Sequence, residues 1–387
     1  MHSLTREEIT LMKRTSLLLS LSLGSFLTTA AFGITGAPSE ITYTDTAGVQ
    51  WIYAFATGNN GHLVANYWNG STWQWADLGL PTGATAVYSP TAITFASGAN
   101  QAIYVFAAAS NGHLVGISWN GVTWLWTDQG LPAGDSAVYY PTAVTYASGA
   151  NQLIYVFAEA SSGHLVVNHW NGSAWQWADQ GLPRRAKTVN NPTAITWAGG
   201  ANQQIYVFAE ASNGDLVVNY WTGSAWQWAD QGLPAGATAV YTPTAITYAS
   251  GPNRLIYVFA VSSTGHLVVN HWNGSTWQWA DQGLPAGASA VNSPSAITYA
   301  SGPNQPIFVF AVDDNYQLVV NDWNGSTWQW ANQGLPEGFS SLSHPSAVTY
   351  ASGANQMIYA FVRGNTGALV VNYWNGYSWN WADQGIM

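Results

Sequence analysis

The chain has 387 residues, 23 of them tryptophan, and its apolar content predicts a folded protein with a large core. Only 7% of the residues are charged and the formal net charge is −10, which argues against nucleic acid and anionic membranes as partners, because both recruit basic patches. The absence of cysteine excludes disulfides and thiolate metal sites.

The N-terminal segment has the order of a secretory signal peptide. A short basic start at Lys13 and Arg14 precedes an apolar run from Ser16 to Leu27, and small residues follow up to Ala31. The apolar run is shorter than the roughly 20 residues that span a bilayer, so we expect no membrane insertion. We predict a leader over residues 1–33, with Met12 as a candidate true start, and a secreted protein. A disordered or helical tail is the alternative.

Residues 34–387 contain one unit repeated seven times. A Trp-Asn-Gly motif, once Trp-Thr-Gly, returns every 51 residues, and two more tryptophans follow it at fixed offsets, as Trp73 and Trp75 do in the first copy. No linker or shift in composition interrupts the series, so we predict one domain. The first tryptophans of the motif are Trp68, Trp119, Trp170, Trp221, Trp272, Trp323 and Trp374.

Each copy holds four short segments rich in β-branched and aromatic residues. In the fifth copy they cover residues 243–248, 255–260, 266–272 and 276–280, with turn-forming residues between them. None has helical periodicity, and the series has no capping unit at either end, which favours a closed ring over an open solenoid. We predict an all-β fold, a seven-bladed β-propeller with four antiparallel strands per blade.

The Asn-Gly in the motif predicts a two-residue type I′ turn between the third and fourth segments. Asn66 then faces Trp73 and His62 faces Asp77, while a four-residue loop would keep the same side chains on each face. Copies four and seven lack the His/Asp pair. The pair recurs as His113/Asp128, His164/Asp179 and His266/Asp281, and as the neutral amides Gln317/Asn332.

The sequence gives little support to catalysis or metal binding. A catalytic pocket needs one asymmetric set of acid and base, whereas the Asp77 position is acidic in six of seven copies, which is typical of a structural role. The remaining acids form no evident cluster, and a Ser-x-Asp-x-Gly-x-x-Trp motif is absent. The histidines lack metal-ligand spacing, and residues 313–315 fit a solvated turn better than a Ca²⁺ site. We expect no enzyme, no metal and no cofactor, with a secreted glycosidase as the least favoured alternative.

Abundant tryptophan and tyrosine on a weakly charged chain suit carbohydrate binding. The C–H face of a sugar packs on an aromatic plane while fixed amides and hydroxyls bond its hydroxyl groups. Seven similar blades would provide up to seven grooves, and linked weak sites gain avidity of about 10²–10⁴. The structural alternative is that the tryptophans fill the space between blades and the His/Asp pairs clasp strand ends.

The repeat Gly-His-Leu-Val-Val-Asn-His-Trp-Asn-Gly-Ser-Thr-Trp-Gln-Trp-Ala-Asp-Gln-Gly-Leu-Pro resembles that of the Photorhabdus-type (PLL-like) bacterial lectins. The resemblance covers all seven copies. It implies a seven-bladed propeller with sugar sites between blades and a preference for L-fucose and, in some members, O-methylated glycans. The chain departs from this pattern in its leader and in three segments, residues 115–118, 184–187 and 313–316, so some grooves are expected to be altered.

We therefore predict a secreted, multivalent lectin whose partners are fucosylated or O-methylated glycans, and a homo-oligomer is compatible with this interpretation. The alternative is a propeller scaffold that binds protein or a cell surface through its flat faces. The candidate sugar-binding residues are the first tryptophan after each turn with polar groups expected near it: Trp73, Trp124, Trp175, Trp226, Trp277, Trp328, Trp379, His62, His113, His164, His266, Glu159 and Glu210.

Overall fold

The computed structural model describes residues 33–97, 100–148, 151–198, 203–250, 253–299, 305–352 and 355–387. The predicted leader lies outside these residues except for Gly33. Within the described ranges, no helix is long and apolar enough to cross a membrane.

The described residues form seven four-stranded antiparallel sheets, each with its strands in sequence order, which confirms the predicted fold class. The first strands are β1 (Ile34–Thr44), β5 (Val87–Ser97), β9 (Val138–Ser148), β13 (Val189–Ala198), β17 (Val240–Ser250), β21 (Val291–Thr298) and β25 (Leu342–Ser352). The second strands are β2 (Gln50–Gly58), β6 (Asn100–Ala109), β10 (Asn151–Ala160), β14 (Gln203–Ala211), β18 (Asn253–Ser262), β22 (Ile307–Asp313) and β26 (Asn355–Gly364).

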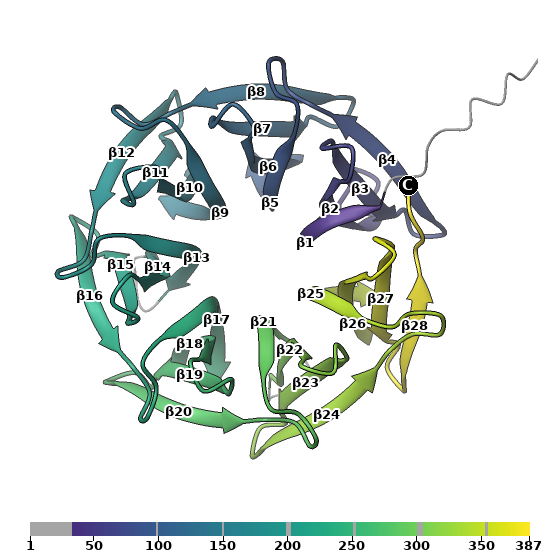
Figure 1. Cartoon of the computed structure of the whole chain (residues 1–387). Helices are drawn as coiled ribbons and strands as arrows, with labels where there is room; N and C mark the ends of the chain where they lie inside the picture. The colour runs from purple at the N-terminus through teal and green to yellow at the C-terminus, as the bar shows by residue number, and fades with distance from the viewer. Residues whose placement is uncertain are drawn as a thin grey trace, which may run out of the picture. The chain divides into compact units, whose positions relative to one another are not determined.

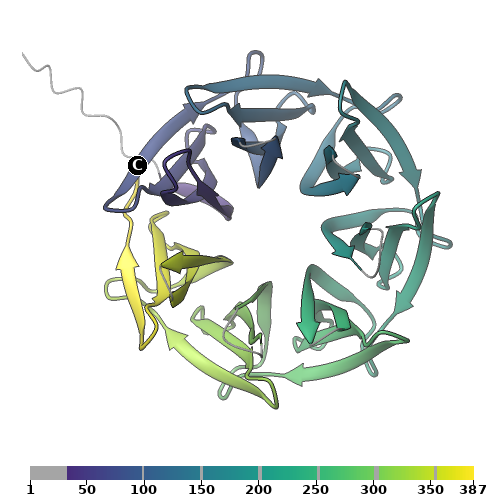
Figure 2. The same ribbon diagram turned by 180° about the vertical axis from the view of Figure 1, so that it is seen from behind.

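The third strands are β3 (Leu63–Trp68), β7 (Leu114–Trp119), β11 (Leu165–Trp170), β15 (Leu216–Trp221), β19 (Leu267–Trp272), β23 (Leu318–Trp323) and β27 (Leu369–Trp374). The fourth strands are β4 (Trp73–Gly79), β8 (Trp124–Gly130), β12 (Trp175–Gly181), β16 (Trp226–Gly232), β20 (Trp277–Gly283), β24 (Trp328–Gly334) and β28 (Trp379–Asp383). Blade one is β1–β4, and the other blades follow in chain order to blade seven, β25–β28. Each first strand lies beside the central opening and each fourth strand at the outer edge (Figure 1), and the view from behind shows the same order (Figure 2).

The ring closes between blade seven and blade one through hydrogen bonds. The Ile34 amide donates to the Gly367 carbonyl oxygen at 2.7 Å, and Arg363 Nε donates to the Ile34 carbonyl oxygen at 2.8 Å. At the outer edge, Trp75 Nε1 donates to the Gln384 carbonyl oxygen at 2.8 Å. The same indole bond joins each pair of neighbouring blades, as from Trp126 to the Leu78 carbonyl oxygen, so the last tryptophan of each repeat has a structural role.

The core lies between neighbouring blades. The phenylalanine at the middle of each second strand is fully buried, because both faces of a blade are covered by other blades. The first tryptophan of the following blade's fourth strand packs edge-on against this ring, as Trp124 does on Phe55 with ring centroids 5.8 Å apart. Such aromatic pairs add about 0.5–1.5 kcal/mol beyond the burial of apolar area. The repeated phenylalanines are Phe55, Phe106, Phe157, Phe208, Phe259, Phe310 and Phe361.

The turn between the third and fourth strands differs from the predicted type I′ turn. Trp68 pairs with Trp73, so the loop has four residues, and Gly70 has a φ of 92° whereas Asn69 is not among the residues with positive φ. The Asn69 side-chain oxygen accepts hydrogen bonds from the Ser71 and Thr72 amides at 3.0 and 2.9 Å, which stabilises a longer loop. The pairing of the third and fourth strands therefore differs by two residues from the predicted register, so that Asn66 pairs with Trp75 and not with Trp73. A shift of two residues keeps each side chain on its predicted face of the blade.

The two open faces of the ring carry different parts of each blade. The hairpin rim is defined here as the face where third strands end and fourth strands begin, next to the Trp-Asn-Gly turns. The proline rim is the opposite face, where first strands begin at a ring of prolines: Pro38, Pro90, Pro141, Pro192, Pro243, Pro294 and Pro345. In six blades the residue before this proline is not glycine and has a φ of 47–53°, a region that non-glycine residues seldom occupy.

Candidate functional site

Aromatic side chains of neighbouring blades meet at every blade interface towards the hairpin rim, and between blades two and three they line a cavity. We call this aromatic surface of an interface the tryptophan groove. Between blades one and two, Tyr53 and Tyr67 stack across β2 and β3 with centroids 5.5 Å apart. Trp124 of blade two approaches the Tyr53 ring at 6.4 Å. The Tyr67 hydroxyl donates to Gln74 Oε1 at 2.7 Å, so an amide adjoins the aromatic wall.

Strand alternation and register place these side chains together. Tyr53, Tyr67 and Gln74 occupy one row across β2, β3 and β4, because Tyr53 pairs with Tyr67 and Tyr67 pairs with Gln74. The same row faces the next blade in every repeat, as Tyr206, Tyr220 and Gln227 do in blade four, where the Tyr220 hydroxyl donates to Gln227 at 2.9 Å. The groove is therefore built from two blades, and one repeat alone does not reveal it.

The tryptophans predicted to bind sugar form one wall of these grooves. Trp175 and Trp170 face Phe95 and Tyr104 of blade two around a cavity of about 100 Å³. Each of the seven also packs against its own blade's motif tryptophan, as Trp277 does on Trp272 at 5.8 Å. The partly buried indoles therefore combine core packing with a position in the groove wall.

The middle residue of the row, on the third strand, varies between blades. The seven residues at this position are Tyr67, Ser118, His169, Tyr220, His271, Asp322 and Tyr373. The His169 ring stacks on Tyr155 at 5.3 Å and the His271 ring on Tyr257 at 5.5 Å. Burial lowers the pKa of both histidines, and the buried Nδ1 of each has no hydrogen-bond partner among the described residues. Burial raises the pKa of the Asp322 carboxyl, so the grooves differ chemically.

The four candidate histidines lie on the proline rim, at the opposite end of the third and fourth strands from the tryptophans. Their predicted pairing with aspartate is confirmed: His62 Nδ1 lies 2.9 Å from Asp77 Oδ2, and the other three pairs have distances of 2.8–2.9 Å. In blade six, Asn332 Nδ2 donates to Gln317 Oε1 at 2.6 Å. The structure therefore confirms the pairs, but it places the histidines away from the tryptophans that the sequence analysis grouped with them.

Glu159 and Glu210 also lie on the proline rim, at the ends of β10 and β14. Glu210 is buried and accepts hydrogen bonds from Asn191 Nδ2 at 2.9 Å and from the Thr242 amide. Burial raises the pKa of Glu210. The pKa of Glu159 is raised to about 7, mainly by burial and also by the charge of Glu210. The two carboxyl groups are thus close to each other and do not line the tryptophan grooves.

Sequence reasoning missed the second-strand aromatic residues and the fourth-strand amides of the grooves. The alternation in Tyr-Val-Phe placed Tyr53 and Phe55 on one face, but the partner across the blade interface was not visible in a single repeat. Among the described residues, no group of three or more His, Cys, Asp or Glu side chains could hold a metal ion.

No protein-family model and no curated protein sequence matches the chain. Among solved structures, it is similar to a lectin from Aleuria aurantia in complex with α-methyl-L-fucoside, with 18% identity, a TM-score of 0.51 and coverage of 77% of this chain and 95% of the lectin. AofleA from Arthrobotrys oligospora has 13% identity and a TM-score of 0.55, covering 79% and 89%. SapL1 lectin in complex with α-methyl fucoside has 17% identity and a TM-score of 0.50, covering 79% and 99%. The Aleuria lectin is described as a six-bladed β-propeller, so the shared feature is the propeller fold.

Proposed function

We propose that this protein is a non-catalytic, multivalent lectin that binds one neutral sugar residue in each competent tryptophan groove. The observation that carries the proposal is the sevenfold repetition of a partly exposed aromatic wall beside an amide or hydroxyl. A sugar needs both, because its C–H face packs on aromatic rings and its hydroxyls need fixed partners. A chain with 7% charged residues also suits an uncharged ligand.

The ligand class that we favour is L-fucose and its glycosides, together with O-methylated glycans. The C6 methyl of fucose, or an O-methyl group, extends the apolar surface that can pack against the indole and tyrosine rings. The resemblance of the repeat to the Photorhabdus-type lectins supports this choice, and so do the fucosides bound to two of the structurally similar lectins.

Export through the predicted leader belongs to the same proposal, because a lectin for cell-surface glycans acts outside the cytoplasm. The order of basic, apolar and small residues before Ala31 supports it. N-terminal sequencing of the protein recovered from culture medium would test it. A mature N-terminus near residue 32 is expected, and an intact N-terminus in the cell fraction alone would contradict it.

The decisive test is a glycan-array screen of the full chain with free L-fucose as competitor. Selective binding that fucose inhibits is expected. Silence on fucosylated and O-methylated glycans alike would reject the lectin and favour a scaffold that binds protein through its flat faces. Turnover of a chromogenic glycoside would contradict the non-catalytic assignment.

A single-groove variant can connect that binding to the hairpin rim. Gln227→Ala removes the amide beside Tyr220, so calorimetric titration with methyl α-L-fucoside should show a lower number of sites with the remaining affinities unchanged. The matched control is Tyr377→Ala, which removes an 86% exposed side chain at the turn of blade seven and should leave the number of sites as it was. Loss of sites in the control alone would contradict the assignment.

A further inference from the structure

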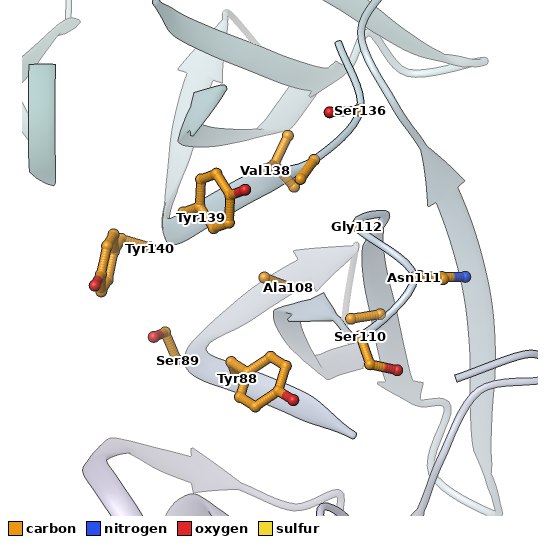
Figure 3. A pocket seen from close by; sticks show the side chains of 12 residues that line it. Tyr88, Ser89, Ala108, Ser110, Asn111, Gly112, Ser136, Val138, Tyr139 and Tyr140 are labelled. Carbon is orange, nitrogen blue, oxygen red and sulfur yellow. The ribbon is translucent and has the colours of Figure 1, made fainter. Parts of the chain in front are cut away.

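A second kind of groove lies on the proline rim between blades two and three, and we call it the tyrosine groove. Its cavity has a volume of about 580 Å³, and Tyr88 and Tyr139 stand on either side of the opening (Figure 3). Their side chains are 51% and 44% exposed, and Tyr140 at the inner end is 50% exposed. Exposed aromatic side chains that lie together form a contiguous patch, which is the kind of surface that marks a ligand-binding groove.

The depth of this groove comes from a small residue at its base. Ala108 pairs with Tyr88 across β5 and β6, at a position where every other blade carries a larger side chain. The walls are fixed, because the Val138 amide donates to the Gly112 carbonyl oxygen at 2.9 Å and a Cβ on Gly112 would collide with the Ser136 carbonyl oxygen. The residues at the Ala108 position in the other blades are Thr57, Glu159, Glu210, Val261, Val312 and Arg363.

The lining is uncharged but rich in groups that can bond hydroxyls. None of the twelve lining residues is Asp, Glu, Lys, Arg or His. Within the described part of the chain, no hydrogen bond is made by the side-chain hydroxyls of Tyr88, Ser89, Ser136, Tyr139 and Tyr140, so all five remain available to a ligand. A charged ligand would find no counter-charge here, whereas a polyhydroxylated ring would find both aromatic faces and hydroxyl partners.

The arrangement occurs once in the ring. The Tyr88 and Tyr139 position is held by Tyr241 in blade five, whose neighbours Asn190 and Asn292 are not aromatic. Blades seven and one carry Ser343 and Thr35 at the same position. Among the described residues, two neighbouring blades both carry tyrosine at this position only between blades two and three, and Tyr241, 47% exposed, is a natural single-tyrosine reference.

We propose that the tyrosine groove is a second ligand site, which binds one neutral pyranose residue between Tyr88 and Tyr139. It lies on the opposite rim from the tryptophan grooves and is present once per chain, so it does not depend on the function proposed for them. The protein would then have one unique binding site in addition to the repeated tryptophan grooves.

The test uses saturation-transfer difference NMR on the full chain with four neutral probes: methyl α-L-fucoside, methyl β-D-galactoside, methyl α-D-mannoside and methyl N-acetyl-β-D-glucosaminide. At least one probe should lose a binding component in the Tyr88→Ala/Tyr139→Ala double variant, with affinity weakened by about a hundredfold or more, because two stacking faces are removed. Ala108→Val, which places in the base the residue found in blades five and six, should weaken the same component.

Two controls separate this site from the tryptophan grooves. Tyr241→Ala should leave the component intact, and Gln227→Ala should leave it intact while it alters the hairpin rim. If no probe shows a component that depends on Tyr88 and Tyr139 in a protein with native thermal stability, the inference is overturned. Fucoside binding that persists in the double variant would still support sugar binding in the tryptophan grooves. The proposal for the tyrosine groove can therefore fail while the proposed lectin function holds.

Discussion

The two rims of the propeller are built on opposite principles. On the hairpin rim, the same tryptophan pair and turn recur in all seven blades. On the proline rim, the second-strand residue at the Ala108 position differs between blades, from Ala108 to Glu210 to Arg363. The tryptophans carry the contact between blades, so a change in any one disturbs an interface. Side chains such as Tyr88 are about half exposed to solvent and can vary one blade at a time. Repetition therefore favours many similar sites on one rim, and variation favours single sites on the other.

Blade two shows how a repeat can depart from the pattern on both rims. It has Ser118 and Leu125 where blade one has Tyr67 and Gln74, so its tryptophan groove has lost the tyrosine–amide pair, and Leu125 is 51% exposed. On the proline rim of the same blade, Ala108 opens the tyrosine groove. We infer that, between blades two and three, the tryptophan groove on the hairpin rim binds sugar more weakly, and that a separate sugar site, the tyrosine groove, is gained on the proline rim.

The largest expected effect is on the free energy of unfolding, which a substitution on the hairpin rim should lower far more than one on the proline rim. Trp277→Ala removes an indole that packs edge-on against Phe208 at 5.6 Å and against Trp272, so it should lower the free energy of unfolding by about 3 kcal/mol as well as remove one groove. Tyr241→Ala on the proline rim should change it by less than about 0.5 kcal/mol. Urea denaturation of both variants measures the difference, and a native-like Trp277→Ala would show that the indole serves binding only.

The seam between blades seven and one carries a buried carboxyl group on the first strand, at a position that is not acidic in the other blades. Glu40 bonds to Ser346, and burial raises its pKa to about 8 from an ordinary value of 4.5. The folded state thus keeps a proton that the unfolded state releases, so this contribution to stability is full below pH 4.5 and is lost as the pH rises to 8. The other blades have alanine at this position, and in blade two the Ala92 amide bonds to Ser39 Oγ at 3.0 Å.

The substitution Glu40→Ala changes the free energy of unfolding, and this change should be more favourable to the folded state at pH 8 than at pH 4.5 by about 1–3 kcal/mol. Thermal unfolding at the two pH values measures this difference. Glu337→Ala, at an exposed position, is the control and should retain the pH dependence of the unchanged protein. An equal effect of Glu40→Ala at both pH values would contradict a protonated carboxyl in the seam.

The repeat was sufficient to predict the propeller, because its period, four strands and absent caps each constrain the architecture. The His62–Asp77 contact was predicted from a register that is two residues off: Asp77 pairs with Val64, and the irregularity between Leu63 and Val64 still leaves His62 within 2.9 Å of Asp77. The loop length itself was misjudged, because Asn69 acts through its side-chain oxygen and not through a positive φ. The grooves could not be completed from one repeat, because Trp124 meets Tyr53 only across a blade interface.

The partly buried histidines of the tryptophan grooves should make the hairpin rim sensitive to acid. The pKa of His169 and His271 is lowered by burial, so the unfolded state takes up protons first as the pH falls below 6.5, and stability is lost towards the lower folded-state pKa. Solvent screening keeps the effect below about 1 kcal/mol per imidazole. The double variant His169→Tyr/His271→Tyr, which copies blade four, should lose less thermal stability between pH 7 and pH 5. The reverse change, Tyr220→His, should lose more thermal stability over the same pH range. An equal dependence of thermal stability on pH in the unchanged protein and both variants would contradict a role for these histidines.

The smallest expected effect concerns the His–Asp pairs of the proline rim. His266 and Asp281 have side chains that are 36% and 56% exposed, so their contact should contribute only about 0.2–1 kcal/mol in a double-mutant cycle. Asp281 also accepts a hydrogen bond from the Gly283 amide at 2.7 Å, and Asp281→Ala should therefore cost more than His266→Ala. Because the pair lies far along the strands from Trp277, both variants should retain every fucoside site in calorimetric titration. A fucoside site lost with His266→Ala would place one of the repeated sites on the proline rim and would contradict their assignment to the tryptophan grooves.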